Sequence, residues 1–288
     1  MLALAIAVTV RIGVFGLFHP VALDVNPVHG QVLVIESSGG AKILEGTASA
    51  RLQSPARVTG RDGGEAAFIL SVPGLDGHPR IQREFHGGLE VLQRDGHLVA
   101  IVTMDLETAV ASIVAAEGSA AVPFEARKAQ AIAARSFLAA GRDRHTDFDF
   151  CDTTHCQFLR APPGDKSAAS RAAVETRGRV LTYEGHAIAA LYSADCGGHT
   201  RTLAEAGWGN GRSGEFTSAY PNFAYPYFAV ECPVHGAIPG HPVSGHQVGM
   251  CQVGAAEMAR RGSTFEEILR HYFPATAIAI ADRELAGL

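Results

Sequence analysis

The chain has 288 residues, of which 47% are hydrophobic and 18% are charged, and its formal net charge is −5. This composition is typical of a globular protein with a substantial core. The acidic balance and the scattered basic side chains argue against a nucleic-acid binder, because such proteins usually carry a basic stripe. We therefore expect no nucleic-acid partner.

The N-terminal stretch MLALAIAVTVRIGVFGLF is apolar and is typical of the tail of an export signal. It lacks a basic n-region and Arg11 interrupts it, so a transmembrane helix is not expected. Four aliphatic residues alternate with other residues, which favours a strand: Val8, Val10, Ile12 and Val14. We expect an exported protein, periplasmic or extracellular, with a membrane anchor in a missing N-terminal segment as one alternative.

Short β-type runs fill the chain up to about residue 102, including QVLVIES, AAFILSV and HLVAIVT. The glycine-rich stretches SSGG, RDGG and FHGG are predicted to separate these strands. From Thr103 the pattern becomes helical, because apolar residues recur at helical intervals between Leu106 and Val114. We therefore expect a β-rich N-terminal region over residues 1–102 and a second region over residues 103–288.

The second region contains signals for helices and for a hairpin. A helix is predicted from residue 124 to about residue 140, ended by Gly141, and a short helix across SAASRAAVETRG. The stretch RVLTYEGHAIAALYSA predicts a β-hairpin that turns at Glu184 and Gly185. Two further helices are predicted, one across GAAEMARRG and one opened by Ser263 with Glu266 in the capping-box position. Strands first and helices later favour an α+β fold.

Two glutamates near the first predicted helices are candidates for an active acid. Glu117 extends the apolar stripe of its helix and lies at the helix end, where the macrodipole disfavours a carboxylate. Partial burial and the dipole predict a raised pKa, which would suit a proton donor. Glu125 lies in the first turn of the next helix with Lys128 three residues on, which is typical of a structural residue. We favour Glu117 without excluding Glu125.

The five cysteines are too few for a disulfide scaffold, and their odd number leaves at least one outside any intrachain pair. CDTTHCQ places Cys151, His155 and Cys156 close together, and thiolate and imidazole are usual zinc ligands. In the alternatives, Cys156 is a small buried residue and Cys151 pairs with a distant cysteine. Cys196 and Cys232 flank a long loop region over residues 196–245 and would pin it as a disulfide if geometry allows.

Two glycine-flanked histidine motifs predict a binding surface. SADCGGHT and SGHQVGMCQ contain hydroxyl, imidazole and amide groups that suit a sugar, and the glycines allow close approach of the backbone. The predicted contacts are Ser193, His199, Thr200, Ser244, His246 and Gln252. Aromatic residues that would stack on sugar or pack in the core are Trp208, Tyr220, Phe223, Tyr225 and Tyr227.

Several segments together resemble the stage II sporulation protein D and amidase-enhancer family. They are EGSAAVPFEARKAQAIAARSF, CDTTHCQ, ALYSADCGGHT and SGHQVGMCQVGAAEMARRGSTFEEILRHYFP. The resemblance implies peptidoglycan binding and a catalytic core with a substrate groove. It also implies lytic transglycosylase activity, which cuts between N-acetylmuramic acid and N-acetylglucosamine in strands that an amidase has stripped of peptides.

The resemblance also assigns roles to single residues. The family's catalytic glutamate matches Glu117, although the usual Glu-Met-Pro is Glu-Gly-Ser here. Some relatives bind zinc through a cysteine and a histidine that match Cys151 and His155. Relatives commonly carry Gly-His-Gly-Val-Gly-Met in the cleft, where Gln247 replaces the middle glycine.

One acid suffices for this reaction, because the muramic acid 6-hydroxyl is the nucleophile, whereas hydrolysing glycosidases usually need two carboxylates. Two alternatives stay open. One is a non-catalytic peptidoglycan-binding module that stimulates a cell-wall amidase. The other is a cysteine hydrolase that uses Cys196 or Cys251 with His199 or His246.

Overall fold

A computed structural model describes residues 8–74, 80–119, 121–141, 144–208, 225–233 and 243–281. The chain forms two compact units. The first comprises Met1–Ala116 and His145–Pro163, and the second comprises Glu117–Arg144 and Gly164–Leu288. These units do not coincide with a division at residue 102, and the boundary of the functional domain stays a prediction. The mixed α+β class is confirmed, whereas the catalytic core and the substrate groove stay predictions.

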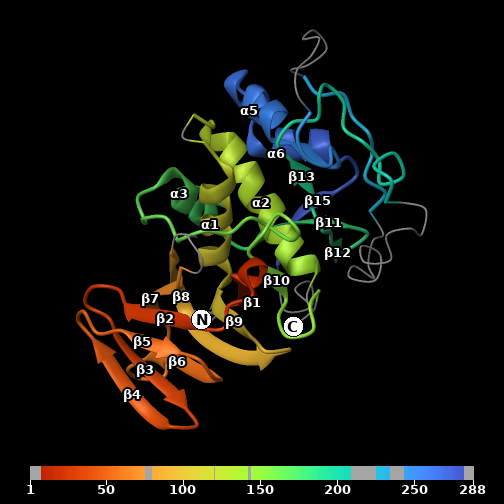
Figure 1. Ribbon diagram of the computed structural model, residues 1–288. Helices are drawn as coiled ribbons and strands as arrows, with labels where there is room; N and C mark the ends of the chain where they lie inside the picture. Colours follow the sequence, from red (N-terminus) through yellow and green to blue (C-terminus); the bar gives the residue numbers. More distant parts are fainter. Residues whose placement is uncertain are drawn as a thin grey trace. The chain divides into compact units, whose positions relative to one another are not determined.

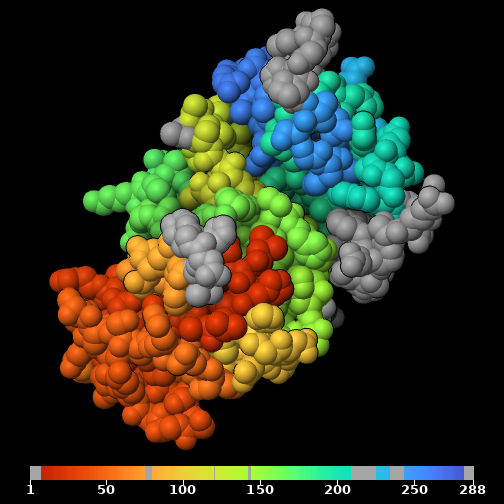
Figure 2. All heavy atoms as spheres, in the orientation of Figure 1, coloured from red at the N-terminus to blue at the C-terminus, as the bar shows by residue number. Residues whose placement is uncertain are grey.

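The first unit is built on a large sheet in which β10, β1, β9, β8, β6, β3 and β4 are neighbours in that order (Figure 1). Its strands are β1 (Thr9–Val14), β2 (Leu23–Pro27), β3 (Val32–Ser37), β4 (Gly40–Glu45), β5 (Ala50–Leu52), β6 (Ala56–Gly60), β7 (Ala66–Val72), β8 (Ile81–Arg94), β9 (His97–Asp105) and β10 (Phe150–Cys151). A short 3-10 helix, η1 (Gly16–Phe18), follows β1. The predicted first strand is confirmed by β1. Figure 2 shows the orange atoms of the β3–β6 region as one continuous body.

The prediction that FHGG separates two strands is wrong, because Gly87 and Gly88 lie inside β8. Residues 81–87 of this strand pair with β7, and residues 88–94 pair with β9. Gly87 has a φ of 143°, and an added Cβ would lie 2.1 Å from the Thr103 carbonyl oxygen. The glycine therefore lets one long strand pass between two partners, which is a usual role of glycine within a strand.

The helical pattern begins later than predicted, because β9 continues to Asp105 and α1 spans Leu106–Glu117. The Asp105 carboxylate accepts hydrogen bonds from the backbone N–H groups of Glu107 (2.9 Å) and Thr108 (3.1 Å). An acceptor at this position satisfies N–H groups that the first turn leaves unpaired. The sequence pattern does not locate this helix start, because the mainly apolar residues before Asp105 fit a strand as well as a helix.

The second unit is arranged around α2 (Phe124–Ala140), which packs against α3 (Ala168–Glu175), α5 (Gln252–Arg260) and α6 (Phe265–Tyr272). Figure 1 shows α2 as a long helix with α5 and α6 near its N-terminal half. Most α2 residues are buried and many are alanine, which allows neighbouring helices to approach closely. The bounds of α2 and its C-cap at Gly141 confirm the prediction.

The hairpin and the C-terminal helices are also present. β11 (Arg179–Tyr183), β12 (His186–Ala187) and β15 (Ala277–Ile280) form a three-stranded antiparallel sheet. Glu184 and Gly185 have φ values of 50° and 84°, as a tight hairpin turn requires. The predicted cap of α6 is wrong by one residue, since Thr264 and Glu267 form the capping box. β13 (Tyr192–Ser193) and β14 (Met250–Cys251) pair in parallel. Within the described residues, no helix has the length and hydropathy to cross a bilayer.

Candidate functional site

Glu117 is the last residue of α1 and its side chain is half-buried. The Gln130 Nε2 group of α2 donates to the Glu117 carboxylate over 3.5 Å. The Tyr192 hydroxyl donates to the same carboxylate and accepts a hydrogen bond from Gln130. Burial and then the Glu117 charge raise the pKa of Tyr192 well above its ordinary value. Two donors from different elements therefore fix the carboxylate, and its predicted raised pKa stays a prediction.

His246 is connected to this site through the backbone of Tyr192. Its Nδ1 accepts the Val248 N–H at 3.1 Å, so the proton of the neutral ring lies on Nε2. The ring also donates to the Tyr192 backbone, which partly offsets the burial that lowers the His246 pKa to about 4. The Trp208 ring centroid lies 5.0 Å from that of His246. A neutral, hydrogen-bonded ring can orient a neighbouring group but does not act as a general acid at neutral pH.

Ser193 carries a buried hydroxyl whose oxygen has no hydrogen-bond partner in the described part of the chain. It follows Tyr192 directly and lies against Gly245, where an added Cβ would be 2.9 Å from the Ser193 Cβ. Buried hydroxyls are nearly always satisfied in folded proteins. The Ser193 hydroxyl is therefore an exception to this rule, and its role in substrate binding stays a prediction.

The other predicted contacts differ in their surroundings. Ser244 is exposed and pairs with Asp195 through two backbone hydrogen bonds. His199 is exposed and forms a β-bridge with Glu231. Thr200 is only 1% exposed, and its hydroxyl accepts the Val230 N–H at 2.8 Å. Gln252 is half-buried at the start of α5. Thr200 thus has a structural contact, and substrate binding by these four stays a prediction.

Two of the five predicted aromatic contacts pack in the core. Tyr225 and Tyr227 are buried, and their hydroxyls donate to the carbonyl oxygens of Pro274 and Ala189. Tyr220 and Phe223 lie outside the described residues. Trp208 is half-buried beside His246, which makes it the predicted aromatic residue near the Glu117 contacts.

Glu125 has the structural role expected from its helix position. Its carboxylate accepts the Phe265 N–H of α6 at 2.9 Å and forms an ion pair with Lys128. Lys128 lies over the Phe265 ring, with its Nζ 4.9 Å from the centroid. These contacts join the starts of α2 and α6.

A cluster of two imidazoles and two thiols lies in the first unit. The ligand atoms of His145, Cys151, His155 and Cys156 are all within 4.8 Å of one another. The His145 Nε2 is 3.3 Å from the Cys156 Sγ, and the His155 Nδ1 is 3.7 Å from the Cys151 Sγ. Sequence reasoning found Cys151, His155 and Cys156 but missed His145, whose only signal is an imidazole six residues before Cys151.

These distances fit one tetrahedral ion. Zinc–sulfur bonds of about 2.3 Å and zinc–nitrogen bonds of about 2.0 Å separate neighbouring ligand atoms by about 3.5 Å. A hydrogen bond from Cys156, with others from His145 and Thr153, lowers the pKa of Cys151 to about 2, although burial opposes the shift. The donor set could therefore hold a metal such as zinc.

Comparison with known families identifies the region that contains both Glu117 and this cluster. Residues 94–183 match the family model SpoIID, the stage II sporulation protein. Over these residues the chain is similar to the SpoIID family. Over 120 residues, it is also 30% identical to an uncharacterized protein of Brachyspira hyodysenteriae. The aligned residues make up 41% of this chain and 33% of the relative. The chain therefore spans about a third of the relative's length.

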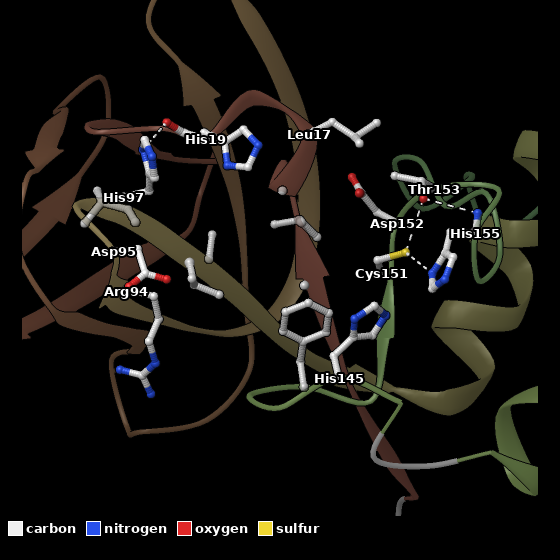
Figure 3. A pocket seen from close by; sticks show the side chains of 17 residues that line it. Leu17, His19, Arg94, Asp95, His97, His145, Cys151, Asp152, Thr153 and His155 are labelled. Carbon is white, nitrogen blue, oxygen red and sulfur yellow. Dashed lines mark hydrogen bonds between the residues drawn. The ribbon is translucent and has the colours of Figure 1, made fainter. Parts of the chain in front are cut away.

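The SpoIID match includes Glu117, Gln130 and the four cluster residues, whereas Tyr192, Ser193 and His246 lie beyond it. The His/Cys cluster borders a cavity of about 570 Å³ in the first unit (Figure 3). Figure 3 shows Cys151 directed toward His155, with His145 nearby. The lining is mainly apolar, including Leu17 and Phe148.

The arrangement does not favour the cysteine-hydrolase alternative. Cys196 and Cys251 are 2% and 0% exposed, and the Cys251 Sγ accepts the Gly254 N–H as the cap of α5. A hydrogen bond with Cys196 lowers the Cys251 pKa, but a hydrogen bond with Cys232 and burial together raise it to about 11. A nucleophilic thiol needs access and thiolate character, and these cysteines have neither.

Proposed function

We propose that this protein is a lytic transglycosylase that cleaves the bond between N-acetylmuramic acid and N-acetylglucosamine in peptide-stripped glycan strands. The SpoIID family is associated with cell-wall lytic activity. The observation that carries the proposal is the position of Glu117, whose carboxylate is held by Gln130 and Tyr192. No second catalytic carboxylate is required when the substrate supplies its own nucleophile.

Glu117 would act first as an acid and then as a base. In its protonated form it donates a proton to the leaving glycosidic oxygen. The resulting carboxylate then accepts the proton of the muramic acid 6-hydroxyl as that oxygen closes the 1,6-anhydro ring. The donors Gln130 and Tyr192 stabilise the ionised form between the two steps. Ser193 and His246 would contact or orient the sugar.

We further propose zinc as the metal of the first unit, with His145, Cys151, His155 and Cys156 as its ligands. Four protein ligands saturate a tetrahedral ion, which is typical of a structural site. The ion would hold the segment between His145 and Cys156 and supply no chemistry to glycan cleavage. Export to the cell envelope and a partner amidase that strips the glycan belong to the same proposal.

Glu117→Gln tests the activity, because it keeps the size and the hydrogen-bonding ability of the side chain but removes the acid. Each variant would be incubated with peptide-stripped glycan, and 1,6-anhydro products would be measured by mass spectrometry. We expect wild type and Glu175→Gln, a control on the exposed side of α3, to release products.

Glu117→Gln should lose at least a hundredfold in rate. Full activity of Glu117→Gln would refute the proposed acid. Glycan binding by wild type without product would instead identify a non-catalytic module that stimulates an amidase.

A further inference from the structure

Three buried thiols meet in the second unit, and the proposed reaction does not use them. The Sγ atoms of Cys196, Cys232 and Cys251 all lie within 4.8 Å of one another. The three residues are 2%, 4% and 0% exposed. They come from separate parts of the chain, since Cys196 follows β13, Cys232 follows Glu231, and Cys251 caps α5.

The three sulfur atoms have different hydrogen-bonding roles. The Cys251 Sγ accepts the N–H groups of Gly254 and Cys196, both at 3.4 Å. It is therefore engaged as the cap of α5 while it remains a thiol. The Cys232 Sγ lies 3.4 Å from the Tyr272 hydroxyl, and its backbone N–H donates to Gly198. Cys196 and Cys232 thus occupy segments that already contact each other.

The group of three thiols is tightly packed. An added Cβ at Gly254 would lie 2.4 Å from the Cys232 Sγ and 1.9 Å from the Tyr272 oxygen. Within the described residues, the group supplies three sulfur atoms and no fourth His, Cys, Asp or Glu ligand. Zinc is almost always held by four ligands in structural sites, so these thiols fit covalent pairing better than zinc.

Burial also favours a neutral disulfide over charged thiolates at this position. Hydrogen bonds with Cys232 and Cys251, together with burial, raise the pKa of Cys196. Thiolate charge is therefore disfavoured in this position, and a metal-bound set of thiolates would bury that charge. A disulfide carries no charge, so its burial has no such cost.

We propose that Cys196 and Cys232 are a redox pair that forms one intramolecular disulfide, with Cys251 as the third thiol beside it. Oxidised glutathione, or a thiol–disulfide exchange protein of the same chemistry, is the oxidant. The Cys232 sulfur attacks one glutathione sulfur and releases one reduced glutathione. Cys196 then attacks the Cys232 sulfur and releases the second. Two protein thiols lose two hydrogens, and one glutathione disulfide is reduced to two thiols.

The disulfide would close the loop over residues 197–231. This loop includes His199 and Thr200 and also Trp208, which lies beside His246. Cross-linking would restrict these groups in the unfolded and folded chain alike. Since the pair is buried, oxidation proceeds during folding or local opening rather than on the closed surface.

The test uses the wild-type full chain, in which peptide mapping separates the thiols of the two units, and a second sample with Cys151→Ser and Cys156→Ser, which removes the thiols of the first unit. The protein is purified without reductant, or refolded with reduced and oxidised glutathione, then alkylated and analysed by peptide mass spectrometry. We expect a peptide pair joined through Cys196 and Cys232, with a mass lower by two hydrogen atoms. Adding Cys251→Ser should leave this link in place. Reduction should lower the melting temperature by about 5 °C or more.

Three outcomes would overturn the proposal. The first is a protein with three free thiols under both preparations, and the second is a link that mainly involves Cys251. The third is one equivalent of zinc retained by the Cys151→Ser/Cys156→Ser variant, which would make the three thiols a metal site. Glycan cleavage is not a readout here, so this test is independent of the proposed function.

Discussion

The Tyr192 hydroxyl donates a hydrogen bond to the Glu117 carboxylate. These residues are far apart in the chain, and the contact is made because β13 carries Tyr192 to the end of α1. The relationship ties a candidate acid to the strand that also bears Ser193.

Tyr192→Phe should lower the rate of glycan cleavage by about tenfold, because one donor to the ionised carboxylate is lost. The alkaline limb of the pH–rate profile, where Glu117 loses its proton, should move to higher pH, since that donor favours ionisation. Tyr183→Phe is the control, as its ring packs against Tyr225 instead. An unchanged rate and pH profile in Tyr192→Phe would show that the contact does not position the acid.

His246 should make the folded state sensitive to acid. Burial lowers its pKa from 6.5 to about 4, so between these values the unfolded chain binds a proton that the folded chain does not. Its contribution is therefore complete above about pH 6.5 and is lost as the pH falls toward 4. The loss should be on the order of 2 kcal/mol after discounting for the ring's partial exposure.

Denaturant unfolding at several pH values measures this effect. His246→Gln should flatten the dependence between pH 4 and 6.5, whereas His186→Gln, on the exposed hairpin, should keep the wild-type slope. Equal slopes in wild type and His246→Gln would contradict the assignment.

Zinc content distinguishes a metal site from four adjacent side chains. We expect about one zinc per chain in wild type by elemental analysis and little in His145→Ala or Cys151→Ser, because each removes one of four ligands. His19→Ala is a matched control: it lines the same cavity but lies outside the cluster. Zinc retention in both cluster variants would refute the ligand set.

Gly249 should tolerate no side chain. Its φ is 73°, and an added Cβ would lie 2.1 Å from the Leu191 carbonyl oxygen. Gly249→Ala should therefore destabilise the protein by more than about 3 kcal/mol. Gly185→Ala, with a φ of 84° and nothing within 4 Å, should cost only about 1 kcal/mol. Similar unfolding midpoints for the two variants would show that the close contact is absent.

Local sequence patterns predicted most helices, strands and turns, whereas features that depend on contacts between residues distant in sequence were not predicted. The alternation near Val10, the bounds of α2 and the turn at Glu184 follow from neighbouring residues alone. Gly87 was misread because its role depends on the carbonyl of Thr103, which belongs to another strand. The cap of α6 was misplaced because Ser263 and Thr264 are chemically similar neighbours.

The candidate site shows the same division. Glu117 stood out because of its place in a helical stripe, and Cys151 and His155 because of their spacing. Gln130 and Tyr192 were missed because a glutamine in an alanine-rich helix and a tyrosine in a short strand have no distinctive pattern. Gln247 stands where relatives commonly have glycine, and it keeps a left-handed backbone with a φ of 64°. Its side chain donates a hydrogen bond to the Cys196 carbonyl at 2.8 Å, a contact that glycine could not make.

The return of residues 145–163 to the first unit affects how the chain can be divided. β10 lies beside β1 in parallel, and it ends at Cys151 within the His/Cys cluster. A fragment cut after α1 would leave one side of β1 without its neighbour, and such bare strand edges promote aggregation. It would also lack every ligand of the cluster. Expression of the N-terminal portion in isolation therefore calls for a fused copy of residues 145–163.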